Sequence, residues 1–397
     1  MKKWMATVLT LVLVLGLCSV SWAEGETNGA VSSSENFYQD ESDHYVWHIK
    51  NLEGLKEFRN NLKNNQWIPV GNYWTPGQND NLKKEAYNGY TIMLDADIDM
   101  GGEAWEPIGS KNDPWQFNGT FDGQGHTISN MTISGSNDNA GFFGFLEPKR
   151  ESGLYIKNLK FDNANVSGGE NAAVLAGTAS LFSSISNITV TNSTVNGSKN
   201  VAGIVGYTQN GGPIDKITVE NVKLYASNKR VGGIAAYVCY QDSRTGSFEK
   251  CSVNNIIIAK SASDSNWPAE SGYLFGLLNS NAGTMQYVLT NCRINGKLVP
   301  AAEVEQQGAG QRTPYTALNV PAFCYGADNT TKVSIVCTET DPVPEPTAPK
   351  YYYYPSTTTT TDTTKGSPKT FDAGVGIYAV TAMLSVTGMV WVSKKRH

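Results

Sequence analysis

The sequence is poor in the residues on which most metal sites and acid–base centres are built. Its 397 residues include 4 histidines and 6 cysteines, and no cysteine spacing typical of a zinc site occurs. A glycine-rich phosphate loop, a nucleophile elbow and a zinc-protease motif are also missing. These absences argue against nucleotide-dependent, zinc-dependent and serine-triad chemistry.

The N-terminus has the pattern of an export signal. Two lysines precede an uncharged apolar run over residues 5–17, and small residues stand at the cleavage spacing before and at Ala23. This order is typical of a secretory signal peptide, so we expect residues 1–23 to be removed on export. A lipid-modified Cys18 is the alternative, but Leu17 stands where such a signal has a small residue.

The C-terminus carries a tether and a membrane segment. Residues 341–367 are rich in proline, threonine and tyrosine, a composition that cannot build a buried core and predicts an extended stalk. Residues 373–392 are uncharged and long enough to span a bilayer, and a basic tail follows them. We therefore expect an outward-facing protein, with residues 368–397 as its sorting and membrane segment.

The start of that segment resembles a sortase sorting signal. In such a signal a Pro-x-Thr core, an apolar helix and a basic tail direct a transpeptidase to cut after the threonine and to join the chain to peptidoglycan. The resemblance implies cleavage after Thr370, attachment to the wall of a Gram-positive bacterium, and sortase and peptidoglycan as partners. Ser367 and Phe371 replace the leucine and glycine of the commonest form. The corresponding residues are Ser367, Pro368, Lys369, Thr370 and Phe371.

Removal of both terminal signals makes the remaining chain acidic. Lys plus Arg falls from 31 to 26 and Asp plus Glu from 36 to 35, so the net charge becomes −9. An acidic ectodomain is a poor partner for nucleic acid or for an anionic membrane.

Five cysteines remain in the exported part, an odd number for a protein outside the cell. Cys324 and Cys337 are spaced to close a small loop, and the sequence leaves that pairing open. We interpret Cys239, Cys251 and Cys292 as packed thiols.

The middle of the chain repeats one unit, and repeats outweigh other signals in assigning a fold. Apolar residues alternate within a unit, as at Ile188 and Val190, which predicts a half-buried strand. No helical period separates the units, so we expect an all-β fold, a right-handed parallel β-helix over residues 111–300. Amides at one corner should stack into a ladder. The asparagines that recur at this place are Asn163, Asn192, Asn221, Asn255 and Asn291.

A second short segment, rich in glycine and alanine, follows each strand, as in Ala202–Tyr207 and Gly232–Tyr237. Small residues suit places where the walls of a coil approach closely. These segments resemble the GLUG motif of bacterial surface proteins, and Trp105–Ile133 is similar to the segment that opens the β-helix in many of them. The resemblance covers about Trp47–Leu298 and implies an architecture, not an activity.

The flanks of the repeats are predicted to close the ends of the solenoid. We expect residues 24–44 to be flexible, residues 45–110 to form an N-terminal cap and residues 301–340 to form a C-terminal cap. Residues 51–65 place leucine and phenylalanine side chains on one helical face behind an asparagine cap. A small helix here would cover the open end of the first coil.

One histidine stands in a stretch that could be a ligand loop or a bend, FNGTFDGQGHTISNMTI over residues 117–133. Its glycines and Asp-Gly pair are typical of a turn into the first coil. The exported part has only His44 and His48 besides His126, and no motif places them. The sequence therefore favours no catalytic histidine.

A calcium loop is the alternative interpretation of a nearby acidic row. That loop requires glycine at its sixth position, where this chain has Met100. We therefore interpret the aspartates as the outward side of a strand and expect neither a metal site nor a cofactor. The residues with calcium-loop spacing are Asp95, Asp97, Asp99 and Glu106.

Aromatic residues before the repeats are the best ligand candidates. Their rings stack on sugar faces, and Tyr73 and Trp74 lie together in a polar loop. The repeat exterior carries hydroxyl and amide side chains, which suit binding better than glycosidase chemistry. We therefore expect a non-catalytic surface protein for adhesion, with host or wall glycans or proteins as partners. The alternatives are a β-helix polysaccharide lyase or glycoside hydrolase, and a passive spacer.

Overall fold

The computed structural model describes residues 34–64, 85–112, 116–148, 153–241, 245–280, 284–299, 302–307 and 332–338. All of them belong to the first of two compact units of the chain, Met1–Pro342. The second unit, Val343–His397, lies outside the described residues.

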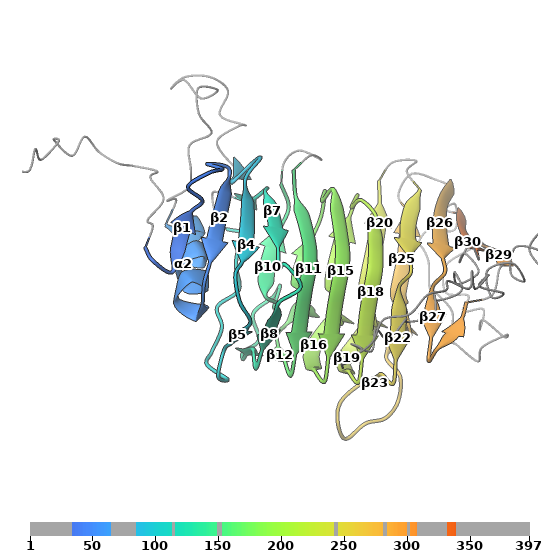
Figure 1. The fold of residues 1–397 in the computed structure, drawn as a ribbon. Coiled ribbons are helices and arrows are strands. Elements are labelled where there is room, and N and C mark those ends of the chain that lie inside the picture. The colour runs from blue at the N-terminus through green and yellow to red at the C-terminus, as the bar shows by residue number, and fades with distance from the viewer. Residues whose placement is uncertain are drawn as a thin grey trace, which may run out of the picture. The chain divides into compact units, whose positions relative to one another are not determined.

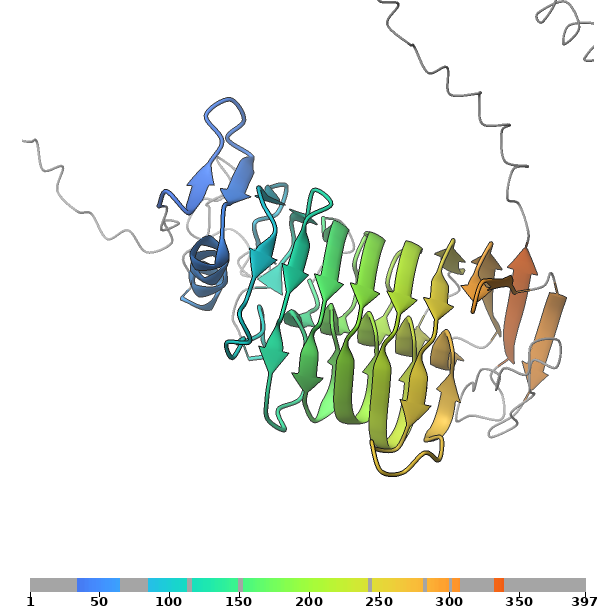
Figure 2. The ribbon, with the colours of Figure 1, turned by 60° about the horizontal axis from the view of Figure 1, so that its bottom comes forward.

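The described region is a parallel β-helix, which confirms the predicted fold. Each of the middle coils contributes strands to three sheets, and equivalent strands of successive coils lie side by side in parallel. Figures 1 and 2 show these rows running from the N-terminal helix at one end to the last strands at the other. Every backbone donor and acceptor of a middle strand can therefore pair with a neighbouring coil.

The strands group by sheet. The first sheet has 16 strands, whose main path is β1 (Phe37–Gln39), β2 (Val46–Ile49), β4 (Thr91–Leu94), β7 (Thr120–Asp122), β11 (Tyr155–Asp162), β15 (Ser184–Thr191), β18 (Ile214–Glu220), β21 (Gly246–Glu249), β26 (Thr284–Thr290), β30 (Lys332–Thr338) and β29 (Ala302–Gln307). The same sheet includes β5 (Ile98–Asp99), β8 (Thr127–Ser129), β22 (Ser252–Asn254), β27 (Arg293–Ile294) and β28 (Lys297–Leu298).

The second sheet has seven strands, β9 (Thr132–Ile133), β12 (Asn165–Ser167), β13 (Glu170–Ala173), β16 (Thr194–Ala202), β19 (Lys223–Gly232), β23 (Ile257–Ala259) and β24 (Ala269–Gly272). The third has five, β10 (Phe143–Leu146), β14 (Ala176–Ala179), β17 (Val205–Gln209), β20 (Ala235–Tyr240) and β25 (Phe275–Ser280). A further two-stranded sheet pairs β3 (Glu85–Ala86) with β6 (Gln116–Phe117).

Stacked apolar columns form the core, and the alternation within each strand explains them. β11 pairs in register with β15 and β15 with β18, so Ile156, Ile185 and Ile214 lie over one another. These three side chains are at most 1% exposed. Parallel pairing in register keeps every inward residue over another inward residue, so one burial pattern repeats from coil to coil.

Asparagines hold the corner between the first and second sheets. Asn163, Asn192, Asn221 and Asn255 have left-handed φ values between 48° and 56°, a region that asparagine tolerates better than most residues. Nδ2 of Asn255 donates to Oδ1 of Asn221 at 2.7 Å, and Asn221 donates to Asn192 at 3.4 Å. Asn192 donates instead to Asp162 at 2.7 Å, which interrupts the ladder.

The prediction that Asn291 joins this column is wrong. The register of β21 and β26 places Asn291 beside Lys250, in a second column of left-handed corners. The register of β22 and β27 places Gly296, which has a φ of 74°, opposite Asn255 at the end of the first column, and Oδ1 of the preceding Asn295 accepts the Asn255 N–H at 2.9 Å. Each coil has two such corners with a left-handed residue. Alignment of the last repeat by its asparagine alone therefore matched Asn291 to the wrong corner.

Glycine is required where consecutive coils approach closely. A Cβ on Gly177 would lie 2.4 Å from the backbone carbon of Asn139, and one on Gly203 would lie 2.4 Å from the carbonyl oxygen of Gly233. Both distances are well inside van der Waals contact. This is the role expected for the small-residue segments.

The helix α2 (Leu52–Lys63) covers the N-terminal end of the coils, as the sequence predicts. The side chain of Asn51 caps it by accepting a hydrogen bond from a backbone N–H of the first turn at 3.1 Å. Leu55, Phe58 and Leu62 are buried against the first coils. The helix thereby removes an apolar end surface from water.

The N-terminal flank differs from the prediction in one respect. Strand β1 lies inside the segment of residues 24–44 that is predicted to be flexible, and it pairs antiparallel with β2. β2 in turn pairs parallel with β4. Stacking therefore begins inside the predicted cap region, well before residue 111.

A loop over residues 260–268 separates β23 from β24 and projects from the edge of the coils (Figure 1). The coils on either side keep their pairing, because β20 and β25 remain in parallel register. No helix among the described ranges is long and apolar enough to cross a bilayer. The predicted membrane segment, residues 373–392, lies outside those ranges.

Candidate functional site

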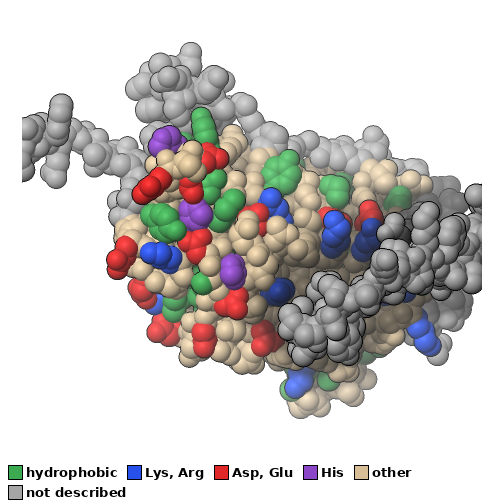
Figure 3. All heavy atoms as spheres, in the orientation of Figure 1, with side chains coloured by type: hydrophobic (Ala, Val, Ile, Leu, Met, Phe, Trp, Pro, Cys, Tyr) green, Lys and Arg blue, Asp and Glu red, His purple; other side chains and the backbone are tan. Residues whose placement is uncertain are grey.

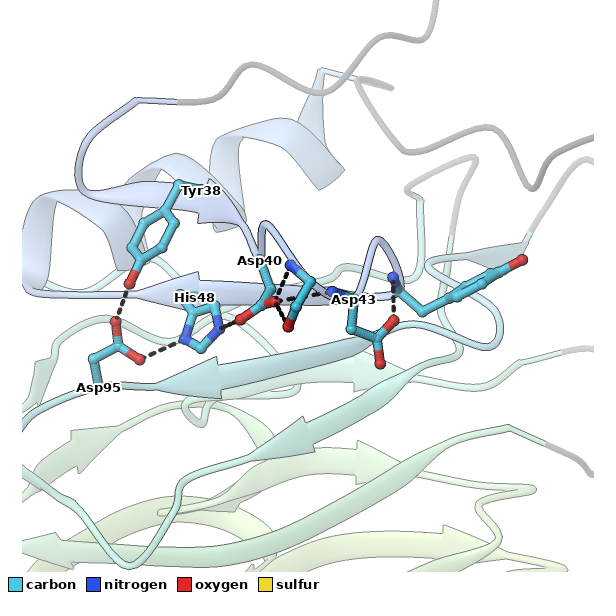
Figure 4. Close-up of polar contacts among 7 residues, drawn as sticks. Tyr38, Asp40, Asp43, His48 and Asp95 are labelled. Atoms are coloured by element: carbon cyan, nitrogen blue, oxygen red, sulfur yellow. Dashed lines mark hydrogen bonds and ion pairs between the residues drawn. The ribbon is translucent and has the colours of Figure 1, made fainter.

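A polar network lies on the outer side of β1, β2 and β4. His48 stands between two carboxylates, with Nδ1 2.6 Å from Oδ1 of Asp95 and Nε2 3.2 Å from Oδ2 of Asp40 (Figure 4). The Tyr38 hydroxyl donates to the other oxygen of Asp95 at 2.8 Å. The Tyr38 ring also stacks on the imidazole, with centroids 5.1 Å apart. We call these four residues the His48 network.

Charge explains how the His48 network is held. A neutral imidazole has one N–H and can donate to one of the two carboxylates, whereas an imidazolium can donate to both. Hydrogen bonds from the Ser42 hydroxyl and nearby backbone N–H groups hold the pKa of Asp40 well below its usual range. The hydrogen bond to Asp95 raises the pKa of Tyr38. Both ring nitrogens face carboxylates, so the imidazole is not placed to activate a nucleophile.

Sequence reasoning missed this network. The available signal was alternation, because His48 lies between the inward-facing Trp47 and Ile49 and must therefore point outward. Its two partners come from distant segments, a hairpin turn and the end of β4. Only the pairing of β1, β2 and β4 brings them together.

The predicted bend at residues 117–133 is present, and it positions a second histidine. β7 and β8 are joined by a turn in which Gln124 and Gly125 have φ values of 53° and 82°. Beyond the turn, Nδ1 of His126 lies 3.1 Å from Oδ1 of Asp97. The same oxygen accepts the Thr127 N–H at 2.8 Å, a bond that lowers the pKa of Asp97.

The four residues with calcium-loop spacing contact separate partners. Asp95 belongs to the His48 network and Asp97 pairs with His126. Oδ1 of Asp99 accepts the Asn130 amide at 2.7 Å, which lowers the pKa of Asp99. Glu106 pairs with a lysine of α2 at 2.6 Å. Within the described ranges, no group of three or more His, Cys, Asp or Glu side chains has the geometry of a metal site.

A cleft opens between the first two coils, where the second and third sheets meet. Its walls come from residues 104–112 and 133–140, with Ser167 of β12 at one side. It has two adjoining lobes of about 260 Å³ and about 460 Å³. We call it the corner cleft. Sequence reasoning gave no signal for it, because its walls are loops brought together by coil stacking.

Charge is distributed unevenly on the face that carries the first sheet. Figure 3 shows acidic side chains gathered over the N-terminal strands and α2, and basic side chains over the middle coils. Several lysines there are paired, as in the contacts of Lys157 with Asp122 at 3.2 Å and of Lys250 with Glu249 at 3.0 Å. The middle of this face is therefore a mixed polar surface.

Three of the predicted cysteine positions are described, and all three are buried free thiols. They are Cys239, Cys251 and Cys292. Burial raises the pKa of Cys251 well above its usual range, which disfavours the reactive thiolate. Burial also raises the pKa of Cys239, whereas a hydrogen bond with Cys251 lowers the pKa of Cys292. All three are packed side chains, as predicted.

Two groups of predicted site residues lie outside the described ranges. One is the aromatic pair Tyr73 and Trp74, and the other is the sorting segment of residues 367–371. Their roles remain predictions from the sequence.

Three comparisons relate the chain to known proteins. No family model matches it. A segment of 110 residues, 25% of the chain, is 34% identical to Halomucin of Haloquadratum walsbyi and spans 1% of that protein. A solved structure from Bacteroides ovatus, provisionally described as an immunoglobulin A1 protease, has a TM-score of 0.37 and 16% identity, over 76% of this chain and 85% of that one. The class that the fold itself defines is a parallel β-helix protein, and the comparisons show no family for the chain.

Proposed function

We propose that this chain is an exported surface protein, joined to peptidoglycan through its C-terminal segment, whose β-helix serves adhesion by contact with host or wall glycans. The signal-type N-terminus, the stalk of residues 341–367 and the sorting-type segment support a surface location. The similarity to a protein named Halomucin supports it as well. A stack of coils offers long lateral faces, which suits contact with an extended polymer.

The observation that carries the non-catalytic part of the proposal is the way in which the carboxylates are held. Glycoside hydrolysis needs a pair of carboxyl groups, of which one has a raised pKa. Hydrogen bonds from Thr127 and Asn130 lower the pKa of Asp97 and Asp99 respectively. Such carboxylates stay ionised and act as hydrogen-bond acceptors, a role that suits sugar hydroxyls better than proton donation.

A glycan array tests the binding function. The exported chain, purified from culture after deletion of residues 368–397, is screened against host and bacterial wall glycans. We expect saturable binding to at least one class of glycan. Failure to bind any of them leaves the passive spacer as the function.

An assay for polysaccharide turnover tests the catalytic alternative. Burial raises the pKa of the Glu147 carboxyl, so this residue is included with the acidic row. Product release from a polysaccharide, lost on Asp97→Ala, Asp99→Ala or Glu147→Gln, would overturn the non-catalytic proposal. We expect no turnover by the unmodified chain.

Cell fractionation tests the anchoring. We expect muralytic digestion to release the protein, and we expect a Thr370→Ala variant to move into the detergent-extractable membrane fraction because cleavage after this residue is blocked. Extraction of the unmodified chain by detergent alone would contradict attachment to peptidoglycan.

A further inference from the structure

The corner cleft gathers several polar side chains without protein partners around one hollow. The side chains of Asn112, Ser134, Asn137 and Ser167 line it, and none of the four forms a hydrogen bond with any part of the protein. By contrast, Oδ1 of the neighbouring Asn139 accepts bonds from Asn171 and Thr178 at 3.0 Å and 2.6 Å. Free amides and hydroxyls that converge on one hollow are available to a ligand.

The walls of the corner cleft are fixed before any ligand arrives. The Asn139 N–H donates to the Glu170 carbonyl at 2.7 Å, and Oδ1 of Asp138 accepts the Glu170 N–H at 2.7 Å. These bonds tie the loop of residues 133–140 to the next coil. A preformed wall reduces the entropy lost on binding.

The opposite wall is fixed by an aromatic stack. The Trp105 ring lies parallel to the Phe142 ring at 5.6 Å, and the Arg59 guanidinium lies 4.9 Å from the Trp105 ring centre. Nε1 of Trp105 donates to the Phe142 carbonyl at 3.1 Å. Trp105 is 5% exposed, so it supports the wall instead of offering a stacking face. Pro107 and Ile133 supply the apolar part of the lining.

Size and charge together restrict the ligand class. The lobes of about 260 Å³ and 460 Å³ fall near or within the range of roughly 300–1,000 Å³ typical of small-molecule sites. Two carboxylates, Glu106 and Asp138, and one lysine, Lys111, line the cleft. Glu106 is paired with Lys63 at 2.6 Å, so the cleft presents one further carboxylate and one lysine and carries no net charge that would attract uronic acids, sialic acid or phosphates. A ligand with many hydroxyl or amide groups and no negative charge matches the lining.

We propose that the corner cleft is a binding subsite for a neutral oligosaccharide, of hexose or N-acetylhexosamine units, with Asn137 and Ser167 as hydrogen-bonding residues. This inference rests on the proposed function of glycan contact, and it assigns that contact to the corner cleft. The two adjoining lobes accommodate neighbouring sugar units of one chain.

The test is calorimetric titration of the full-length chain, purified from the cell envelope, with chitotetraose and maltotetraose as neutral probes. An Asn137→Ala, Ser167→Ala double variant loses two hydrogen bonds, so we expect its Kd for the bound probe to rise by about 10-fold or more. Sialyllactose and trigalacturonate should bind at least about 10-fold more weakly than the neutral probe.

The matched control is Asn196→Ala. Asn196 is stacked beside Ser167 in the next coil, outside the cleft lining, and we expect its substitution to leave the Kd unchanged. Circular dichroism and the thermal midpoint establish that all variants fold.

The outcomes separate this inference from the proposed function. If the glycan array finds a ligand whose Kd the double variant does not change, the subsite is refuted and glycan contact elsewhere stands. If the acidic probes bind the cleft as tightly as the neutral ones, the assignment to neutral sugars is refuted. If no glycan binds the chain at all, the proposed function fails and the subsite fails with it.

Discussion

Two regions of the molecule fill their apolar interior with different side chains. They are the N-terminal region, residues 34–148, and the later coils, residues 153–299. Seven of the chain's 13 phenylalanines lie in the first region, and the rings of six of them pack on one another in its core. In the later coils the inward columns are mainly isoleucine, valine and alanine in register. A repeated coil needs a side chain that stacks on a copy of itself, whereas a closing end must fill an irregular space.

The same two regions differ in charge. The described residues of the first carry 15 acidic and 5 basic side chains, a net charge of −10, whereas those of the second carry 7 acidic and 11 basic, a net charge of +4. They also differ in how polar groups are used. The corners of the later coils bond amides to amides, whereas the first region holds the His48 network and the corner cleft. In the regular coils the corner amides hydrogen-bond to one another. In the irregular N-terminal region some polar side chains form no bond within the protein and are available to a ligand.

The largest effect is expected from the aromatic packing of the first region. The Phe121 ring is fully buried, with centroids 5.4–6.0 Å from those of Phe58, Phe142 and Phe143. Phe121→Ala should lower the free energy of unfolding by about 3–5 kcal/mol in urea titrations followed by circular dichroism. Ile217→Val, in a stacked column of the later coils, should cost about 0.5–1.5 kcal/mol. Equal losses would remove the distinction between the two cores.

The next effect concerns the asparagine corners of the later coils. Asn221 has a φ of 56° and bonds to both Asn192 and Asn255. Asn221→Ala loses these bonds and places an alanine in the left-handed region, so we expect a loss of about 2–3 kcal/mol. Asn221→Gly keeps the backbone angle available and should lose only about 1 kcal/mol. Identical losses in urea unfolding would mean that the backbone angle carries no cost.

A gain is expected at the second corner column. Lys216 has a φ of 54° where the preceding coil has Asn187, and lysine tolerates this angle less well than asparagine. Lys216→Asn should raise the free energy of unfolding by about 0.5–1 kcal/mol. Lys223→Asn changes the same charge at an exposed position with an ordinary backbone angle and serves as the control. An equal gain there would attribute the effect to charge.

The smallest effect is the response of the acidic row to pH. Hydrogen bonds lower the pKa of Asp97 and Asp99 from 3.8, so their stabilising contribution is present above about pH 4 and is lost as the pH falls through the lowered values. We expect Tm to fall in this acid range, and to fall less in an Asp97→Asn variant. Glu220→Gln is the control, because the Glu220 side chain is exposed and forms no hydrogen bond or ion pair with the protein. A similar change in that variant would exclude a specific role for Asp97.

The sequence predicts those features of the fold that are local and repeated. Alternation identified the strands, and the apolar face of residues 51–65 identified the capping helix. The alignment of corner residues from one coil to the next was harder to predict. Both corner columns use residues with left-handed φ values, and only the short strand β27 separates Asn291 from Asn295. Local sequence does not say which residue continues which column.

The site features were not predictable in the same way. His48 meets Asp40 across a hairpin turn and Asp95 across a strand pair. The corner cleft depends on the spacing between two loops in consecutive coils. Such sites depend on pairing between separate segments of the chain, and a single sequence does not reveal that pairing.

The loop of residues 260–268 shows how this scaffold can change its surface. It closes on itself through the bond of the Lys260 N–H to the Asn266 carbonyl at 2.9 Å, while the strands on both sides keep their partners. Corner segments of different length can therefore be exchanged without refolding the coils. A chain with this fold can thereby acquire a new surface one loop at a time.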